Sequence, residues 1–134
     1  MSAELLDDLR ERLTQIALPT YGHAAGYGTI ALNHAIRKFA SDWRLGAIQE
    51  YSVEAFRRPD GYNGRIDWLV KSKDRSVHWA IEIDRANKRW SLEKLLRAHL
   101  LGMTPIWIRW RAPISIEIPE HVTVIDLCRR KTAS

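Results

Sequence analysis

The chain is poor in cysteine and has no long apolar run. Cys128 is its single cysteine, which excludes an internal disulfide framework and is typical of a reducing compartment. No apolar stretch approaches the length of a membrane span, and the first eight residues lack the basic and then apolar layout of a signal peptide. We therefore expect a cytoplasmic protein with no membrane contact.

What is present fits one folded domain. The 134 residues are enough to bury a sizeable core, so residues 1–134 are interpreted as a single domain. Lys and Arg outnumber Asp and Glu by 21 to 16, and basic proteins of this size often contact polyanions. Six tryptophans are many for this length, and we expect most of them in the core because aromatic side chains bury large areas.

Hydrophobic periodicity and turn residues predict an α/β sandwich with a mixed β-sheet flanked by helices. Thr29 and Ser91 are the expected N-caps of the second and third helices. The expected elements are helices at about 3–17, 30–42 and 92–102, and strands at about 47–56, 66–70, 77–84, 105–110 and 122–127. The first three strands form a meander, and the helix after them permits a crossover connection.

Three carboxylates interrupt the second and third of these strands. Asp67 lies in the first of the two, and Glu82 and Asp84 lie in the next, among branched and aromatic residues. Acids inside apolar strands reduce stability unless they are paired. A bound metal ion is one such partner.

Burial selects the pairing of the two strands. Side chains alternate between faces, so the apolar faces coincide if Val70 pairs with Val77. In this register Asp67 lies opposite Ala80 and diagonal to Glu82, roughly 7–8 Å away at the backbone. The acids then gather on one patch of one face. On the apolar face we expect Ile66, Trp68, Val70, Val77, Trp79, Ile81 and Ile83.

The order of elements and the two acidic segments resemble the PD-(D/E)XK nuclease superfamily. The resemblance covers about residues 29–110, within a core of about 29–127 preceded by an extra N-terminal helix, and it rests on Gly64-Arg-Ile-Asp67 and Ala80-Ile-Glu-Ile-Asp84. It implies a restriction-endonuclease-like αβββαβ core. It also implies that Asp67 and Glu82 bind Mg²⁺, for which Mn²⁺ can substitute, with the backbone carbonyl of Ile83 as a further ligand.

The sequence departs from the family pattern at two places. Asp84 replaces the usual lysine two residues after the glutamate, and Lys88 and Lys94 are the candidates for a relocated lysine. Asp84 would then orient a water, act as general base or hold a second ion. The glutamate that many members carry on the first core helix is also missing, because that helix offers Asn33 and His34 instead.

Cations follow the acidic strand closely. Five positive charges occur within thirteen residues, and a tryptophan among them could stack on a base or sugar. A charge run of this kind is often only a solvated helix face, but its position beside the acids favours contact with a phosphate backbone. The candidate nucleic-acid-binding residues are Arg85, Lys88, Arg89, Trp90 and Arg97, with Lys94 assigned to catalysis.

Several hypotheses remain open. The first is a Mg²⁺-dependent nuclease acting on DNA, as a homodimer if it cuts both strands. The second is a catalytically inactive nucleic-acid-binding or protein-interaction module on the same fold, and the third is a small α/β protein whose basic surface has no nucleic-acid role. At the residue level, Asp67 could pair with Arg65 or Arg85, and Glu82 and Asp84 could be the exposed face of an amphipathic strand without metal.

Overall fold

The computed structural model describes residues 2–18, 25–52, 61 and 64–128. They form an α/β fold with a five-stranded mixed sheet and three helices. In chain order the elements are α1 (Ser2–Thr14), α2 (Ala25–Asp42), β1 (Gly46–Ser52), β2 (Arg65–Lys71), β3 (His78–Asp84), α3 (Arg89–Leu100), β4 (Thr104–Arg109) and β5 (Thr123–Asp126). None of the described helices is long and apolar enough to cross a membrane.

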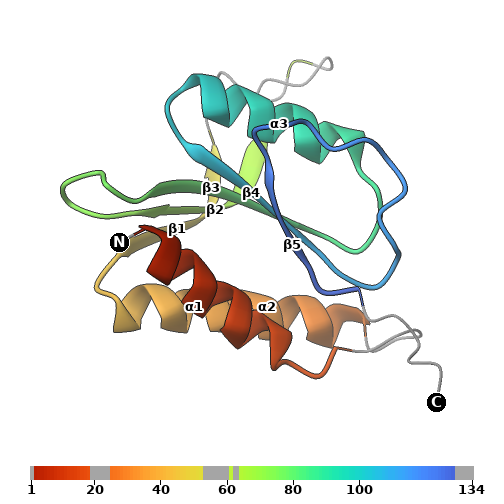
Figure 1. The fold of residues 1–134 in the computed structure, drawn as a ribbon, viewed down its shortest axis with the longest axis horizontal. Helices are drawn as coiled ribbons and strands as arrows, with labels where there is room; N and C mark the ends of the chain where they lie inside the picture. The colour runs from red at the N-terminus through yellow and green to blue at the C-terminus, as the bar shows by residue number, and fades with distance from the viewer. Residues whose placement is uncertain (1, 19–24, 53–60, 62–63, 129–134) are drawn as a thin grey trace.

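The strands lie in the sheet in the order β1-β2-β3-β4-β5. The first three are antiparallel neighbours, and β3, β4 and β5 run parallel to one another. Helix α3 is the crossover between β3 and β4, as the sequence predicts. Helices α1 and α2 cover one face of the sheet and α3 covers the other (Figure 1).

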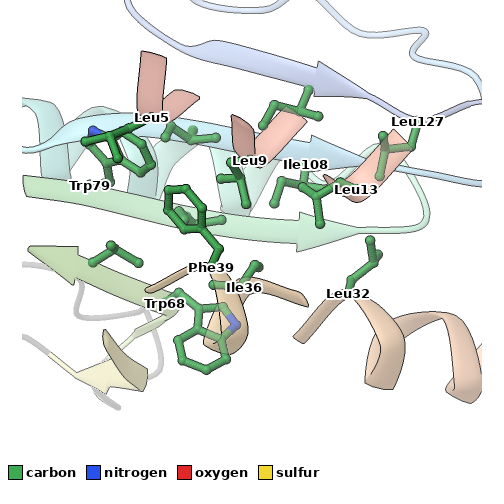
Figure 2. Packing of buried hydrophobic residues seen from close by; sticks show 14 of the residues in the cluster. Leu5, Leu9, Leu13, Leu32, Ile36, Phe39, Trp68, Trp79, Ile108 and Leu127 are labelled. Carbon is green, nitrogen blue, oxygen red and sulfur yellow. The ribbon is translucent and has the colours of Figure 1, made fainter. Parts of the chain in front are cut away.

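Each face of the sheet has its own hydrophobic cluster. The larger cluster lies between the sheet and α1 and α2, where Phe39 stacks on Trp79 with ring centroids 5.9 Å apart (Figure 2). The smaller one lies between the sheet and α3 and includes Leu95 and Trp107. Four of the six tryptophans are buried, as expected: Trp68, Trp79, Trp107 and Trp110.

The predicted start of the second helix is wrong. Helix α2 begins at Ala25, so Thr29 lies inside the helix and is not its N-cap. Gly26 and Gly28 both lie within this helix, and Gly28 has a packing role: a Cβ at this position would overlap the ring of Trp110. Close approach between helix and sheet, not a turn, accounts for this glycine.

The predicted cap of the third helix is also wrong. Helix α3 begins at Arg89, and its N-cap residue Lys88 makes no side-chain capping hydrogen bond. Ser91 lies in the first turn, where its hydroxyl donates to Glu82 at 3.3 Å. The other boundaries shift by a few residues. Helix α1 ends at Thr14, and residues 53–56 of the predicted first strand lie outside the described residues.

The predicted pairing of β2 with β3 is displaced by two residues. Val70 pairs with Trp79, and Leu69 pairs with Ala80. The turn is longer by two residues than expected, and it is held by the Asp74 carboxylate, which accepts hydrogen bonds from the hydroxyls of Ser72 (2.6 Å) and Ser76 (2.8 Å). A shift of two residues keeps the alternation of faces, so the prediction failed in register and not in parity.

Candidate active site

The β2–β3 ladder gives way to side-chain hydrogen bonds at the acidic residues. Its last pair at this end is Trp68 with Ile81, and the next position of the same register places Asp67 level with Glu82. The N–H of Ile83 donates to Asp67 Oδ2 at 2.7 Å, and the N–H of Asp67 donates to Glu82 Oε1 at 3.2 Å. The two residues therefore lie level with each other on neighbouring strands, and not diagonally as the predicted register implied.

Glu82 is enclosed by groups from helix α3. It is 2% exposed, and Lys94 Nζ lies 3.1 Å from its Oε1. Lys94 also donates to the backbone carbonyl of Arg65 on β2 at 2.6 Å. One lysine from α3 thus joins the ends of the two acidic strands, and its charge lies beside the carboxylate.

Burial alters the protonation of both acids. Desolvation, together with the nearby charge of Asp67, raises the pKa of Glu82 to about 8, although Lys94 acts in the opposite direction. Desolvation also raises the pKa of Asp67, against the stabilising N–H of Ile83. Two crowded, poorly solvated carboxylates favour any cation that can replace those protons.

A cavity of about 140 Å³ opens beside Asp67. Its lining comes from α2, β1 and the ends of the two acidic strands, and consists of Thr29, Asn33, Gln49, Glu50, Asp67 and Ile83. Asn33, noted in the sequence for its place in the helix, accepts a 2.8 Å hydrogen bond from the indole of Trp68. Asp67 therefore borders the α2 side of the sheet, whereas Glu82 contacts α3.

The alternation of faces breaks at this point in β2. Ile66 was expected beside Trp68 on the α1 and α2 face, but it packs in the cluster under α3. The neighbouring strand has Glu50 at a positive φ of 54°, an uncommon backbone conformation for a residue other than glycine. The simple two-residue period of the sequence could not show this local distortion.

Asp84 has different surroundings from the other two acids. It is 8% exposed, and its Oδ2 accepts a 2.8 Å hydrogen bond from the indole of Trp107, while Lys88 Nζ lies 3.9 Å from Oδ1. The described residues contain no group of three His, Cys, Asp or Glu that could hold one metal ion. The expected patch of three acids around one cation is therefore not formed. Since Glu82 and Asp84 are buried, the alternative of an exposed amphipathic face is wrong as well.

Each of the acids Asp67 and Glu82 keeps one oxygen without a backbone hydrogen bond from the residues that the structure describes. Neither Asp67 Oδ1 nor Glu82 Oε2 accepts a hydrogen bond from a backbone N–H of the described residues. In a strand the N–H and C=O of one residue point to the same side, so the carbonyl of Ile83 faces β2 and Asp67. One or two carboxylates with oxygen neighbours are what Mg²⁺ requires, because it keeps several waters and adds substrate phosphates.

The predicted cations lie on the loop before α3 and along that helix. Arg85, Lys88 and Arg89 are exposed. The guanidinium of Arg97 lies 4.9 Å from the ring centroid of Trp90, so the residue expected to stack on a base already contacts a cation.

The proposed structural ion pairs of Asp67 are not formed with described residues. Arg65 points to Glu50, with 3.7 Å between Nη1 and Oε2, and Arg85 forms no ion pair within the described part of the chain. The charges of Lys94 and Lys88 act to lower the pKa of Asp67, against the larger effect of desolvation, which raises it.

Sequence reasoning missed the groups that support these side chains. Ser91 was interpreted as a cap, and neither Trp107 nor the fully buried Arg109 was connected with the acids. One signal was available for Arg109: like the acids, it is a charged residue within an otherwise apolar strand. Nothing in the spacing of Ser91 or Trp107 would have revealed their partners.

Comparisons with known proteins do not assign the chain to a family. No protein-family model matches it, and no curated protein matches it. Among solved structures, a chain of the cryo-EM structure of the DrdV–DNA complex is 21% identical, with a TM-score of 0.33. The match covers 76% of this chain but 10% of that one. So weak a structural likeness supports no argument about mechanism.

Proposed function

We propose that the chain is a Mg²⁺-dependent nuclease that hydrolyses phosphodiester bonds of DNA, on a PD-(D/E)XK core with Glu-x-Asp in place of Glu-x-Lys. The observation that carries this proposal is the position of Lys94 Nζ, 3.1 Å from the buried carboxylate of Glu82. The same carboxylate accepts the N–H of Asp67. The buried carboxylate of Glu82 therefore contacts both Lys94 and the backbone of Asp67, although the lysine comes from α3 and not from β3.

Each of these residues has a role in the proposed reaction. Asp67, Glu82 and the carbonyl of Ile83 would hold Mg²⁺. The ion would supply polarisation of the scissile phosphate, an activated water and neutralisation of charge at the transition state. Lys94 adds a fixed positive charge beside that position, and a preorganised charge of this kind is typically worth ~10²–10³ in rate. Asp84, held by Trp107, orients Lys88 in this scheme and does not itself act as a base.

The cations around this site suit a nucleic-acid backbone. The exposed Arg85, Lys88 and Arg89 follow the acidic strand directly. Further along α3, the guanidinium of Arg97 lies against the ring of Trp90. Positive charge at the rim of a carboxylate site attracts phosphates while leaving the metal position to the acids. If both strands of a duplex are cut, the active form is a homodimer.

Nicking of supercoiled plasmid DNA with Mg²⁺ or Mn²⁺ tests the proposal. We expect cleavage by the wild-type chain, and its loss in Asp67→Ala and Glu82→Gln. Gln15→Ala serves as a control because this amide is exposed just after the end of α1, a helix that supplies no residue to the site. Cleavage that persists in both acid variants would rule out this site as the catalytic one.

A second candidate function is a DNA-binding module without cleavage. It is favoured by the hydrogen bonds of the acids, since Asp67 and Glu82 each already accept a backbone N–H, and by Asp84 at the usual lysine position. Salt-sensitive DNA binding that survives Asp67→Ala, with no cleavage in any divalent metal, would support this candidate over the first. If the chain shows no salt-sensitive binding to DNA, both candidate functions are contradicted.

A further inference from the structure

Arg109 is a buried charge on β4. It is 0% exposed, and among the described residues it forms no ion pair. Its guanidinium donates to the Asp84 carbonyl (3.2 Å), to Asn87 Oδ1 (2.7 Å) and to the Ala112 carbonyl (2.7 Å), and it lies 4.8 Å from the ring centroid of Trp107. A buried guanidinium is tolerated only when its donors are satisfied, so this residue fixes three segments in relation to one another.

Asn87 extends this network to the surface. Its side-chain N–H groups donate to Ser115 Oγ (2.7 Å) and to the Pro113 carbonyl (3.2 Å), while its Oδ1 also accepts the Ser115 N–H (3.2 Å). Two backbone hydrogen bonds run in parallel, from Trp110 to Asp84 and from Ala112 to Arg85. The loop between β3 and α3 is thus tied to the segment that follows β4.

This loop carries exposed cations directly after the acidic strand. Residues 85–88 follow β3 directly and include Arg85 and Lys88, both exposed, and Arg89 begins α3. A loop without regular structure would hold such charges loosely. Ordering it in the free protein lowers the entropy lost on binding and therefore increases affinity.

We propose that Arg109 and Asn87 are positioning residues, which hold the basic loop 85–88 beside the carboxylates so that its cations meet a DNA phosphate backbone. This inference rests on the proposed function. It also separates two roles that the sequence did not distinguish: the exposed cations contact phosphate, whereas the buried cation contacts only protein.

Two alanine substitutions at opposite ends of one hydrogen bond test the inference. Asn87→Ala removes the side-chain hydrogen bonds that the basic loop makes to Arg109, Pro113 and Ser115. Ser115→Ala removes the same hydrogen bond from the other side, outside the basic loop. We expect Asn87→Ala to raise the Kd for a short DNA duplex about tenfold. The slope of log affinity against log salt should become shallower by about one for each phosphate that the loop no longer neutralises. Ser115→Ala should act in the same direction, and the double variant should be no weaker than Asn87→Ala alone.

The outcomes distinguish positioning from direct contact. Additive effects, or a Ser115→Ala variant that binds like the control Gln15→Ala, would mean that Asn87 touches DNA itself and would overturn the inference. In cleavage assays KM should rise while kcat at saturating DNA stays within about twofold, because the acids are untouched. A lower kcat with unchanged KM would also overturn it.

Hydrogen exchange separates failure of this inference from failure of the proposed function. A wild-type chain that binds no DNA contradicts the proposed function. In that case the exchange of the amides of residues 85–88 decides whether the network positions the loop. Faster exchange in Asn87→Ala, with β3 and α3 unchanged, supports the network, and unchanged exchange overturns it.

Discussion

Lys94 Nζ lies 3.1 Å from Glu82 Oε1, and both side chains are almost fully buried. The pair joins helix α3 to strand β3, and the bond from Lys94 to the Arg65 carbonyl adds strand β2. A lysine that approaches from the helix has the same relation to the carboxylate as one placed on the strand itself. We propose that Lys94 supplies from α3 the positive charge that the PD-(D/E)XK pattern places on the strand.

Replacement of this lysine should affect catalysis and stability together. Lys94→Met keeps much of the side-chain length but leaves Glu82 without its cation, so we expect the cleavage rate to fall by ~10²–10³. Because Glu82 has a raised pKa and can take up a proton, we expect the free energy of unfolding to fall by less than the ~3–5 kcal/mol that an unpaired buried charge costs. Single-turnover rates and denaturant unfolding measure the two effects. Full activity in Lys94→Met would remove this residue from the proposed mechanism.

The raised pKa of Glu82 predicts how stability depends on pH without metal. Between its ordinary value of 4.5 and about 8, the folded chain keeps a proton on Glu82 that the unfolded chain has released. The free energy of unfolding therefore falls as pH rises through this window, by at most about 1.4 kcal/mol per unit of pKa difference. The raised pKa of Asp67 acts in the same direction.

Denaturant unfolding in EDTA at pH 5, 7 and 9 measures this dependence. Glu82→Gln cannot lose a proton, so its stability should fall less than that of the wild type between pH 5 and 9. Equal slopes for the two proteins would contradict a raised pKa at this position.

The contact between Trp90 and Arg97 predicts that the two residues act as a unit. If the ring holds the guanidinium in place for a phosphate, Trp90→Ala weakens DNA binding only while Arg97 is present. A double-mutant cycle with Arg97→Ala should give a coupling of about 0.5–1 kcal/mol. Trp43→Ala is the control, because Trp43 is a half-exposed tryptophan on the other face of the sheet. Additive losses would instead indicate that Trp90 stacks directly on a base.

Gly28 and Gly26 offer a matched test of the packing of α2. A Cβ at Gly28 would overlap the Trp110 ring, whereas a Cβ at Gly26 meets no atom within 4 Å. We expect Gly28→Ala to destabilise the fold by ~1–3 kcal/mol. Gly26→Ala should stabilise it by up to ~1 kcal/mol because alanine favours the helix. Thermal unfolding of both variants checks the pair, and equal effects of the two would contradict this packing.

The sequence predicted the fold best where the periodicity of apolar residues determines which face of an element is buried. Alternating apolar residues correctly predicted the meander, the crossover helix and the burial of most tryptophans, because each of these depends on which face of an element is apolar. The predicted register of β2 and β3 was wrong by two residues, since hydrogen bonds among Ser72, Asp74 and Ser76 hold a longer turn. A shift of two residues leaves each side chain on the same face of the sheet, so the alternation of apolar residues cannot reveal it.

The site was predictable only in its composition. Asp67 and Glu82 stood out as acids in apolar strands, and the structure makes them cross-strand neighbours. The spacing could not show that Asp84 bonds to Trp107, or that Lys94 rather than Lys88 approaches Glu82. These interactions depend on the rotation of α3 and the position of β4, which are tertiary properties.

The rate of cleavage of a labelled DNA duplex as Mg²⁺ is added tests the central claim most directly. We predict that the single-turnover rate of the wild-type chain rises with Mg²⁺ concentration and saturates. Asp67→Asn, which keeps the side-chain shape but weakens the metal ligand, should be slower by at least ~10² at every concentration. A wild-type chain that binds the duplex but cleaves none at any Mg²⁺ or Mn²⁺ concentration, or an Asp67→Asn variant as fast as the wild type, would contradict the account.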